Sequence, residues 1–280
     1  TDVHVRPMEK IINIAFRVDG VIQSMLSLGN EFKRLISTVK LRASMNISDA
    51  RLPQDGAFVL ELNEKHYDIR VSTIVAPFGE SAVMRVLPRD NEVLRLSQLG
   101  FIPKHLSLIE EAFRQPSGII LLTGPTGSGK TTTLHAGVRS MNLLNTNIVS
   151  VEDPIEYRIP LIRQTEVNVK AGYTFSKAIK HFLRHDPDVI LVGEIRDTET
   201  AKIAITAAET GHLVLSTLHT NNALAVIPRL RALGIQNHMI ADSLKCCISQ
   251  RLVRKVCSVC KTTHISTEEE MTYLGLDKPV

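Results

Sequence analysis

The sequence contains no tryptophan, and aromatic residues make up only 4% of its 280 positions. Such a chain offers few rings on which nucleobases can stack. Basic residues are not gathered in one stretch either, since 33 lysines and arginines are scattered among 29 acidic residues, for a formal charge of +4. These absences argue against a nucleic-acid groove, so we expect no direct nucleic-acid binding.

Long apolar runs are also missing. No stretch reaches the roughly 18 apolar residues of a membrane span, and the first residues do not follow the basic, apolar and small-residue order of a signal peptide. We therefore expect an intracellular protein, whose four cysteines should not form stabilising disulfides. The chain does not begin with methionine, which suggests a fragment, and a hydrophobic content of 44% over 280 residues predicts two domains.

Residues 1–90 are dominated by period-two alternation, which begins with Val3 and Val5. The pattern predicts strands there and near residues 14–18, 58–62, 67–73 and 82–87, with an Asp19-Gly20 turn after the second. Apolar residues at helical spacing between Phe32 and Val39 predict one amphipathic helix. We expect a small α+β domain.

Helix-like and strand-like runs alternate after this segment. We place a linker and entry to the next domain at residues 91–103, an α/β domain at residues 104–256 and a separate C-terminal segment at residues 257–280. Alternation of this kind is typical of a parallel sheet with helices on both faces.

A phosphate-binding loop is the most informative motif of the second domain. Residues 124–131 fit G-x-x-x-x-G-K-[ST] between an apolar run and a helix predicted from about residue 132 to 141. Glycines allow backbone N–H groups to approach phosphates, lysine reaches the outer phosphates and threonine binds Mg²⁺. The predicted nucleotide-binding residues are Gly124, Pro125, Thr126, Gly127, Ser128, Gly129, Lys130, Thr131 and Thr132.

Carboxylates follow two later strand-like runs. Glu152, Asp153 and Glu156 come after residues 147–151, although the first two are also suited to capping the next turn. Glu194 comes after the apolar run 189–192, a position from which a carboxylate holds Mg²⁺ or orients the attacking water. A carboxylate after a strand is often only a loop residue, but its distance from the phosphate loop favours the functional interpretation of Glu194.

Two histidines flank the next apolar run. His212 precedes residues 213–218 and His219 follows them. Histidines beside strands often have structural roles, and this is the interpretation we favour for His212. For His219 a structural role and a sensing role, toward the γ-phosphate or a neighbouring subunit, are equally suited.

Four stretches together resemble the secretion ATPases of type II secretion and of type IV pilus assembly and retraction. They are GPTGSGKTTT, VEDPIEY, DPDVILVGEIRD and TGHLVLSTLHT, and the resemblance continues through TDVHVRP, FRVDGV, RLPQDG, DIRVST and GESAVMRVL. It implies a RecA-like ATPase domain preceded by a second N-terminal, PAS-like domain, with the first N-terminal domain missing. It also implies a cytoplasmic homo-hexamer, peripheral at the inner membrane, that binds ATP and Mg²⁺.

The resemblance also implies roles for particular residues and partners. Lys130 and Thr131 match the nucleotide loop, Glu156 the catalytic glutamate and Glu194 the Mg²⁺-linked acid, while His212 and His219 match the histidine box. The expected partners are an inner-membrane platform protein and its cytoplasmic adaptor, and indirectly pilins or pseudopilins.

Two arginines of the first domain form a separate prediction. Arg70 and Arg85 lie on predicted strands among apolar neighbours, where a guanidinium requires a partner. An intradomain salt bridge is one such partner. The resemblance implies the other, in which both arginines act as fingers that reach the triphosphate across a hinge or subunit boundary.

The cysteines bear on the subtype. Cys257 and Cys260 form a C-x-x-C pair, which is half of a four-ligand zinc site, and His264 is a further candidate ligand. Free thiols are the alternative. We expect Cys246 and Cys247 to pack in the core, on a helix predicted around residues 239–250. In the resembling family such pairs mark assembly and secretion members, so we expect zinc in a longer chain.

We therefore expect an ATPase motor for filament assembly. Two alternatives remain, a retraction or DNA-uptake motor of the same superfamily and a scaffold that binds nucleotide without hydrolysing it. The presence of Lys130, Thr131, Glu156 and Glu194 together argues against the scaffold.

Overall fold

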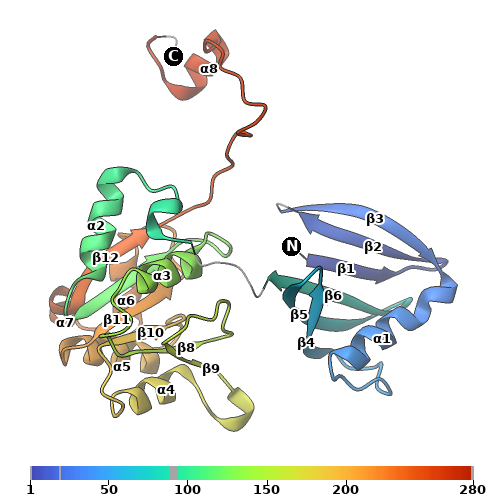
Figure 1. Ribbon diagram of the computed structural model, residues 1–280, viewed down its shortest axis with the longest axis horizontal. Helices are drawn as coiled ribbons and strands as arrows, with labels where there is room; N and C mark the ends of the chain where they lie inside the picture. The colour runs from blue at the N-terminus through green and yellow to red at the C-terminus, as the bar shows by residue number, and fades with distance from the viewer. Residues whose placement is uncertain (1, 19, 89–93, 279–280) are drawn as a thin grey trace.

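The computed structural model describes residues 2–18, 20–88 and 94–278, which form two sheet-containing domains and a C-terminal segment (Figure 1). Asp19 of the predicted turn and residues 91–93 of the predicted linker lie outside the described residues.

The first domain is a six-stranded antiparallel sheet in the order β3-β2-β1-β6-β5-β4. Its strands are β1 (Asp2–Pro7), β2 (Ile11–Val18), β3 (Val21–Gly29), β4 (Gln54–Leu62), β5 (Lys65–Ala76) and β6 (Gly79–Pro88). A short 3₁₀ turn η1 (Asn30–Lys33) leads into α1 (Arg34–Arg42). This architecture confirms the predicted α+β domain.

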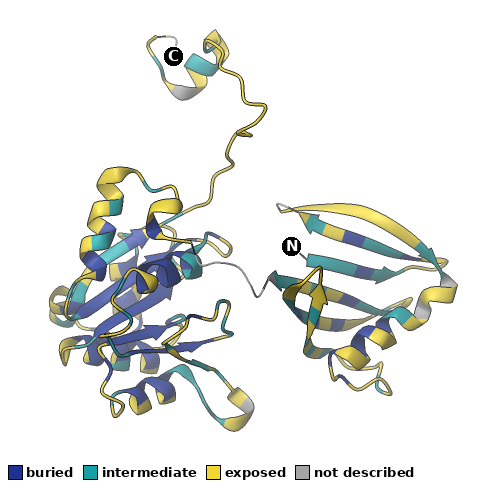
Figure 2. Ribbon diagram, in the orientation of Figure 1, coloured by how far each residue is buried: buried dark blue, intermediate teal, exposed yellow. Residues whose placement is uncertain are grey.

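Alternation along the strands separates the two faces of this sheet. Val5, Ile12 and Ala82 point to one face and form a core with Ile36 of α1. Val71 and Ile69 continue that core beside Val39. The opposite face has no helix on it in the described chain, and the residues there are largely exposed or half-buried (Figure 2).

A buried ion pair joins α1 to the sheet. Lys40 is fully buried, and its Nζ lies 2.7 Å from Glu80 Oε1 and 2.8 Å from the carbonyl oxygen of Asp49. The lysine therefore binds β6 and the connection between α1 and β4 at once. Because an unpaired charge is costly in the interior, loss of either partner of this ion pair should destabilise the domain strongly.

The second domain is a six-stranded sheet in which each neighbouring pair is parallel, in the order β12-β7-β11-β10-β8-β9. The strands are β7 (Gly118–Thr123), β8 (Ile148–Glu152), β9 (Arg163–Glu166), β10 (Val189–Val192), β11 (Leu213–Leu218) and β12 (Leu244–Ser249). Every residue of β7, β8, β10 and β11 is buried, as expected for strands covered on both faces.

Helices cover both faces of this sheet, which confirms the predicted α/β fold. One face packs against α2 (Pro103–Phe113) and α3 (Lys130–Arg139). The other packs against α4 (Phe175–Phe182), α5 (Thr198–Glu209), α6 (Val226–Ala232) and α7 (Asn237–Ser243). Short 3₁₀ turns η2 (Leu96–Gln98) and η3 (Val169–Ala171) complete the domain.

Three details differ from the sequence-based expectations. The helix predicted around residues 239–250 is wrong after Ser243, because β12 begins at Leu244 and pairs with β7. The helix after the phosphate loop begins at Lys130 rather than residue 132. Leu96, inside the predicted linker, is 3% exposed and packs in the core of the second domain, so that domain begins before residue 104.

The chain beyond β12 leaves the second sheet. Residues 251–264 carry no helix or strand and are exposed, and α8 (Glu268–Leu274) lies away from both sheets in Figure 1. Thr267 and Glu270 form a capping box at the start of α8. Among the described residues, no helix has the length and apolar content needed to cross a bilayer.

We expect Lys40→Met to lower the free energy of unfolding by about 3–5 kcal/mol, because it leaves the Glu80 carboxylate without its buried partner. Lys180→Met is the matched control, since Lys180 makes a contact of the same length, 2.7 Å, to Glu199 at the surface. Its cost should be at most about 1 kcal/mol. Urea unfolding measures both values, and equal losses in the two variants would contradict the role given to Lys40.

Candidate nucleotide-binding site

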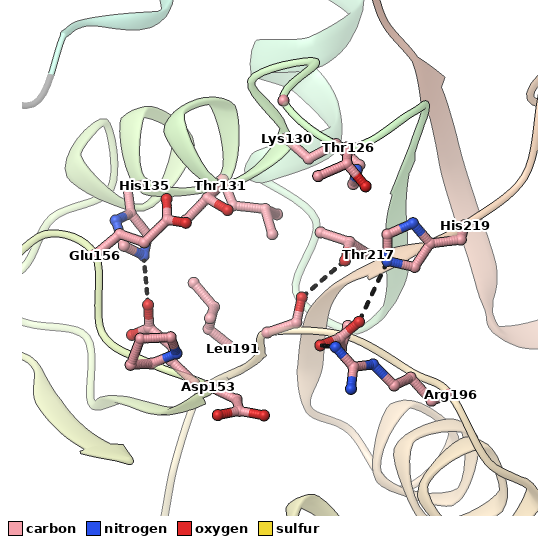
Figure 3. A pocket seen from close by; sticks show the side chains of 16 residues that line it. Thr126, Lys130, Thr131, His135, Asp153, Glu156, Leu191, Arg196, Thr217 and His219 are labelled. Carbon is pink, nitrogen blue, oxygen red and sulfur yellow. Dashed lines mark hydrogen bonds and ion pairs between the residues drawn. The ribbon is translucent and has the colours of Figure 1, made fainter. Parts of the chain in front are cut away.

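The candidate site lies at the carboxyl edge of the parallel sheet. Because β7, β8, β10 and β11 run in the same direction, the segments that follow them meet at one edge. A cavity of about 350 Å³ opens there, lined by residues from all four segments. Figure 3 shows Lys130 and Thr131 facing Asp153 and Arg196 across it.

The phosphate loop has the backbone that its glycines permit. Gly124, Gly127 and Gly129 have φ values of 142°, 75° and 85°, a region that favours glycine. A Cβ on Gly124 would lie 2.3 Å from the carbonyl oxygen of Gln250, so this position also excludes a side chain by close approach. The loop leads directly into the N-terminus of α3, where free N–H groups favour an anion.

Lys130 is the central cation of the cavity. It is only 9% exposed, and its Nζ donates hydrogen bonds to the carbonyl oxygens of Gly124 and Pro125 at 3.0 Å each. Burial lowers the pKa of Lys130, while the charges of Glu194 and Glu156 act in the opposite direction. Both carboxylates are therefore near enough to interact with the ammonium, and the cavity gathers the predicted acidic and basic groups.

Glu194 is held from two sides at the end of β10. Its carboxylate lies 2.5 Å from Arg196 Nη2 and 3.3 Å from His219 Nε2. Hydrogen bonding to Glu194 is the main cause that raises the pKa of Arg196. The structure thus brings His219 to the cavity, and it adds Arg196, which the sequence analysis did not single out although it stands within the quoted motif DPDVILVGEIRD.

The phosphate loop and the histidine segment are linked at their bases. Thr123, the last residue of β7, donates from its Oγ1 to the carbonyl oxygen of Thr220 at 2.6 Å. The backbone N–H of Thr220 donates in turn to Thr123 Oγ1 at 3.1 Å. Thr217 also lines the cavity and donates to the carbonyl oxygen of Gly193 at 2.8 Å.

The acidic segment after β8 divides into two parts. Glu156, the expected catalytic carboxylate, lines the cavity, and Asp153 lines it as well. Glu152 lines it too, but its side chain is buried, with His135 Nε2 at 3.0 Å. Capping of the following turn, considered from the sequence for Glu152, is not what its side chain does. His135 lies on α3 and was not predicted.

His212 does not line the cavity, although the sequence analysis predicted it as a site residue. It precedes Leu213, the first residue of β11, and so lies at the amino end of a strand whose carboxyl end carries His219. Its Nδ1 is 3.0 Å from the carbonyl oxygen of Ala207. Of the predicted nucleotide-binding loop, Thr126, Gly127, Lys130 and Thr131 line the cavity, whereas Gly124, Pro125, Ser128, Gly129 and Thr132 do not.

Arg70 and Arg85 lie side by side on the helix-free face of the first sheet. They are directly opposite in the β5–β6 register, and both line a second cavity of about 970 Å³ together with Asp153 and Pro154. The expected apolar surroundings are wrong for Arg85, whose side chain is 64% exposed. Its Nε donates to Asp2 Oδ1 at 2.9 Å, so it makes the intradomain salt bridge considered as the alternative.

The C-terminal thiols do not complete a metal site. Cys257 and Cys260 are exposed, and no group of three potential ligands could hold a metal ion in the described parts of the chain. Backbone N–H groups of Cys260 and Val259 lower the pKa of the Cys257 thiol. His264, the other candidate ligand, lies 3.1 Å from Glu270.

Cys246 and Cys247 occupy β12 and point to opposite faces of the sheet, each packed against a different core. Burial raises the pKa of Cys246, and it raises that of Cys247 to about 11. These thiols are half-buried and pack against the two cores from a strand, whereas we expected them inside the core on a helix.

The chain is similar to a known protein family and to characterised relatives. The family model described as "Type II/IV secretion system protein" matches residues 1–277. Type II secretion system protein E of Aeromonas hydrophila is 44% identical over 278 residues, 99% of this chain and 56% of that protein. Type IV pilus assembly ATPase PilB of Acinetobacter baylyi is 44% identical over 277 residues, 98% of this chain and 48% of that protein. The chain thus spans about half the length of these relatives.

Solved structures agree with the fold. The pilus retraction motor PilT with bound ADP superposes with a TM-score of 0.69 at 30% identity, covering 92% of this chain and 76% of that one. The Legionella pneumophila ATPase DotB gives a TM-score of 0.72 at 24% identity, covering 90% and 72%. The second likeness supports the fold alone.

We expect Gly124→Ala to weaken ATP binding by roughly tenfold or more, because a methyl group there meets the carbonyl oxygen of Gln250 and the backbone is strained. Gly100→Ala is the control, since Gly100 also has a positive φ, 82°, but open space around its Cβ position. Titration with a fluorescent ATP analogue measures both affinities. Unchanged affinity in Gly124→Ala would show that the loop tolerates a side chain where the structure excludes one.

Proposed function

The chain belongs to the family of type II/IV secretion system proteins, and on that basis we propose that it binds and hydrolyses ATP as the motor part of a secretion or pilus-assembly machine. The observation that carries the proposal is that Lys130, at the start of α3, lines one cavity together with Glu156 and Glu194. This is the charge arrangement that phosphoryl transfer requires, because its catalysis is mainly positioning and electrostatic stabilisation.

The phosphate loop would hold the triphosphate of ATP. Its backbone N–H groups and the amino end of α3 favour an anion, and Lys130 supplies a cation that is already desolvated. The hydroxyl of Thr131 and the carboxylate of Glu194 line the same cavity and are oxygen ligands of the kind that Mg²⁺ takes. This pair would hold the ion if Glu194 exchanged its contact with Arg196 for it. When bound with ATP, Mg²⁺ supplies neutralisation of charge on the phosphate oxygens.

Glu156 is our proposed catalytic carboxylate. It lines the cavity on the segment that follows β8, where it would orient or activate the attacking water. His219, in contact with Glu194, would sense the outer phosphate or position that water. Within one chain His212 has no place in this step, because its strand carries it to the other edge of the sheet.

Arg70 and Arg85 would complete the charge stabilisation as arginine fingers. Their cavity and the nucleotide cavity share Asp153 and Pro154, which supports an approach of the first domain toward the phosphates. For Arg85 this requires exchange of the Asp2 carboxylate for a phosphate. Such a dependence would couple hydrolysis to rotation of the first domain against the second.

The assembly or secretion type is favoured by identity. Curated relatives named for type II secretion and for pilus assembly are 44–45% identical to the chain, whereas the structure of the retraction motor PilT is 30% identical. We propose a homo-hexamer that is peripheral at the cytoplasmic side of the inner membrane, and that acts on a platform protein and its adaptor. Zinc at Cys257 and Cys260 is proposed only for a longer chain that supplies further ligands.

We expect Lys130→Ala to abolish measurable phosphate release by the full-length oligomer, because it removes the cation that meets the outer phosphates. Lys202→Ala, which changes an exposed lysine on α5, should keep the wild-type rate. A phosphate-release assay compares the three proteins. Equal release by Lys130→Ala and the wild type would instead leave a scaffold that binds nucleotide without hydrolysing it.

Arg70→Ala and Arg85→Ala should each lower the turnover number of the full-length oligomer substantially, since arginine fingers contribute roughly 10³–10⁵ in rate where they have been measured. The affinity for ATP should stay within a few-fold of wild type. Arg17→Ala is the control, because Arg17 lies on the same sheet face but donates to the carbonyl oxygen of Gly20 at 2.7 Å. Unchanged turnover in both finger variants would remove the role.

A further inference from the structure

His135 and Glu152 form a buried polar pair beside the candidate site. Their side chains are 1% and 3% exposed, and His135 Nε2 lies 3.0 Å from Glu152 Oε2. Within the described residues, His135 Nδ1 is buried and has no hydrogen-bond partner. The Glu152 carboxylate is therefore the polar contact that orients this ring. The dashed line at His135 in Figure 3 marks the contact.

Two further side chains donate hydrogen bonds to the Glu152 carboxylate. Ser150 Oγ donates to Glu152 Oε1 at 2.7 Å, and Gln164 Nε2 donates to the same oxygen at 3.0 Å. Burial alone would raise the pKa of Glu152, but the hydrogen bonds from His135, Ser150 and Gln164 and the charge of His135 lower it overall. The network thus holds a charged carboxylate in the interior, which is costly if a donor is removed.

The same network holds the segment that carries Glu156. Gln164 Nε2 also donates to the carbonyl oxygen of Tyr157 at 2.9 Å, and Gln164 Oε1 accepts from the backbone N–H of Ile159 at 2.8 Å. The His135 ring meets the Tyr157 ring edge-on, with centroids 5.6 Å apart at 80°. Glu156 lies between Glu152 and Tyr157, and both of these residues are held by the network.

His135 connects this segment to the phosphate loop. It follows Thr131 by four residues on α3, so the two side chains lie on one face of the helix. His135 thus places α3 in direct contact with Glu152 and Tyr157. A position that needed only packing would be filled equally well by an apolar side chain, whereas a buried carboxylate requires a donor.

We propose that His135 and Glu152 are a positioning pair that sets Glu156 at the correct distance from the phosphate loop. The inference rests on the proposed ATPase function, but the pair is defined by contacts that do not depend on it. Neither residue donates to or accepts from the reacting atoms in this scheme. They act through the backbone of the segment 153–159.

The test compares variants of the full-length oligomer. His135→Leu removes the donor, His135→Gln keeps an N–H donor on a flexible side chain, and Gln164→Leu breaks the network without changing α3. Val138→Ala is the control, because Val138 is also fully buried on α3 but packs in the apolar core. Turnover number, KM for ATP and hydrogen exchange of segment 153–162 are measured below the unfolding temperature of every variant.

His135→Leu and Gln164→Leu should lower the turnover number by roughly tenfold to a hundredfold, the cost of a small displacement of a catalytic group. In these two variants KM for ATP should change less than about threefold, and hydrogen exchange of segment 153–162 should rise. His135→Gln should keep a turnover number and an exchange rate of this segment that are closer to wild type than those of His135→Leu. Val138→Ala should lower stability while keeping turnover and exchange of that segment near wild type.

The inference is wrong if His135→Leu loses no more turnover than Val138→Ala, or if His135→Gln is as impaired as His135→Leu. If the wild-type oligomer releases no phosphate, the proposed function fails instead. Hydrogen exchange then still decides about the pair, since unchanged exchange of segment 153–162 in His135→Leu and Gln164→Leu would overturn it.

Discussion

The second domain depends on one electrostatic constraint, the placement of the Lys130 ammonium away from water and within reach of two carboxylates. Burial destabilises the charged form of this amine, and Glu194 and Glu156 counteract that effect. The parallel sheet brings these three groups together at one of its edges. Strand β7 is fully buried and its glycine-rich continuation turns sharply. The parallel strands β8 and β10 of the same sheet place their acidic ends at the same edge. A polyphosphate with its metal ion is the ligand that such a mixed set of charges suits.

Much of this arrangement is visible in the sequence because parallel strands buried on both faces leave unbroken apolar runs. The run of residues 189–192 coincides with β10, and residues 213–218 coincide with β11. The same property explains the error at residues 239–250. A short apolar run such as that around Cys246 and Cys247 has no period that separates a buried helix from a buried strand, and pairing with β7 decides between them.

The contacts within the site are less visible, since they join side chains that are distant in sequence. In the sequence His135 is one of several polar residues of α3, and only the fold brings it to Glu152 and Tyr157. Arg70 reads as a charge among apolar neighbours, but Ile69 and Val71 belong to the other face of the sheet. Arg85 shares its face with Val83 and Leu87, yet its side chain is exposed. The separation of His212 from His219 was predictable in principle, because the two histidines flank a single strand and must lie at its opposite ends.

The two cavities meet at Asp153 and Pro154, so the segment after β8 borders both the phosphate loop and the arginines of the first domain. That segment is where binding, hydrolysis and domain movement would be coupled. The most direct measurement is a crystal structure of the chain with Mg²⁺ and a non-hydrolysable ATP analogue. We expect the terminal phosphate to contact Lys130 Nζ and to lie between Glu194 and Glu156. A triphosphate bound elsewhere, or one that leaves either carboxylate facing away from the phosphates, would contradict the account.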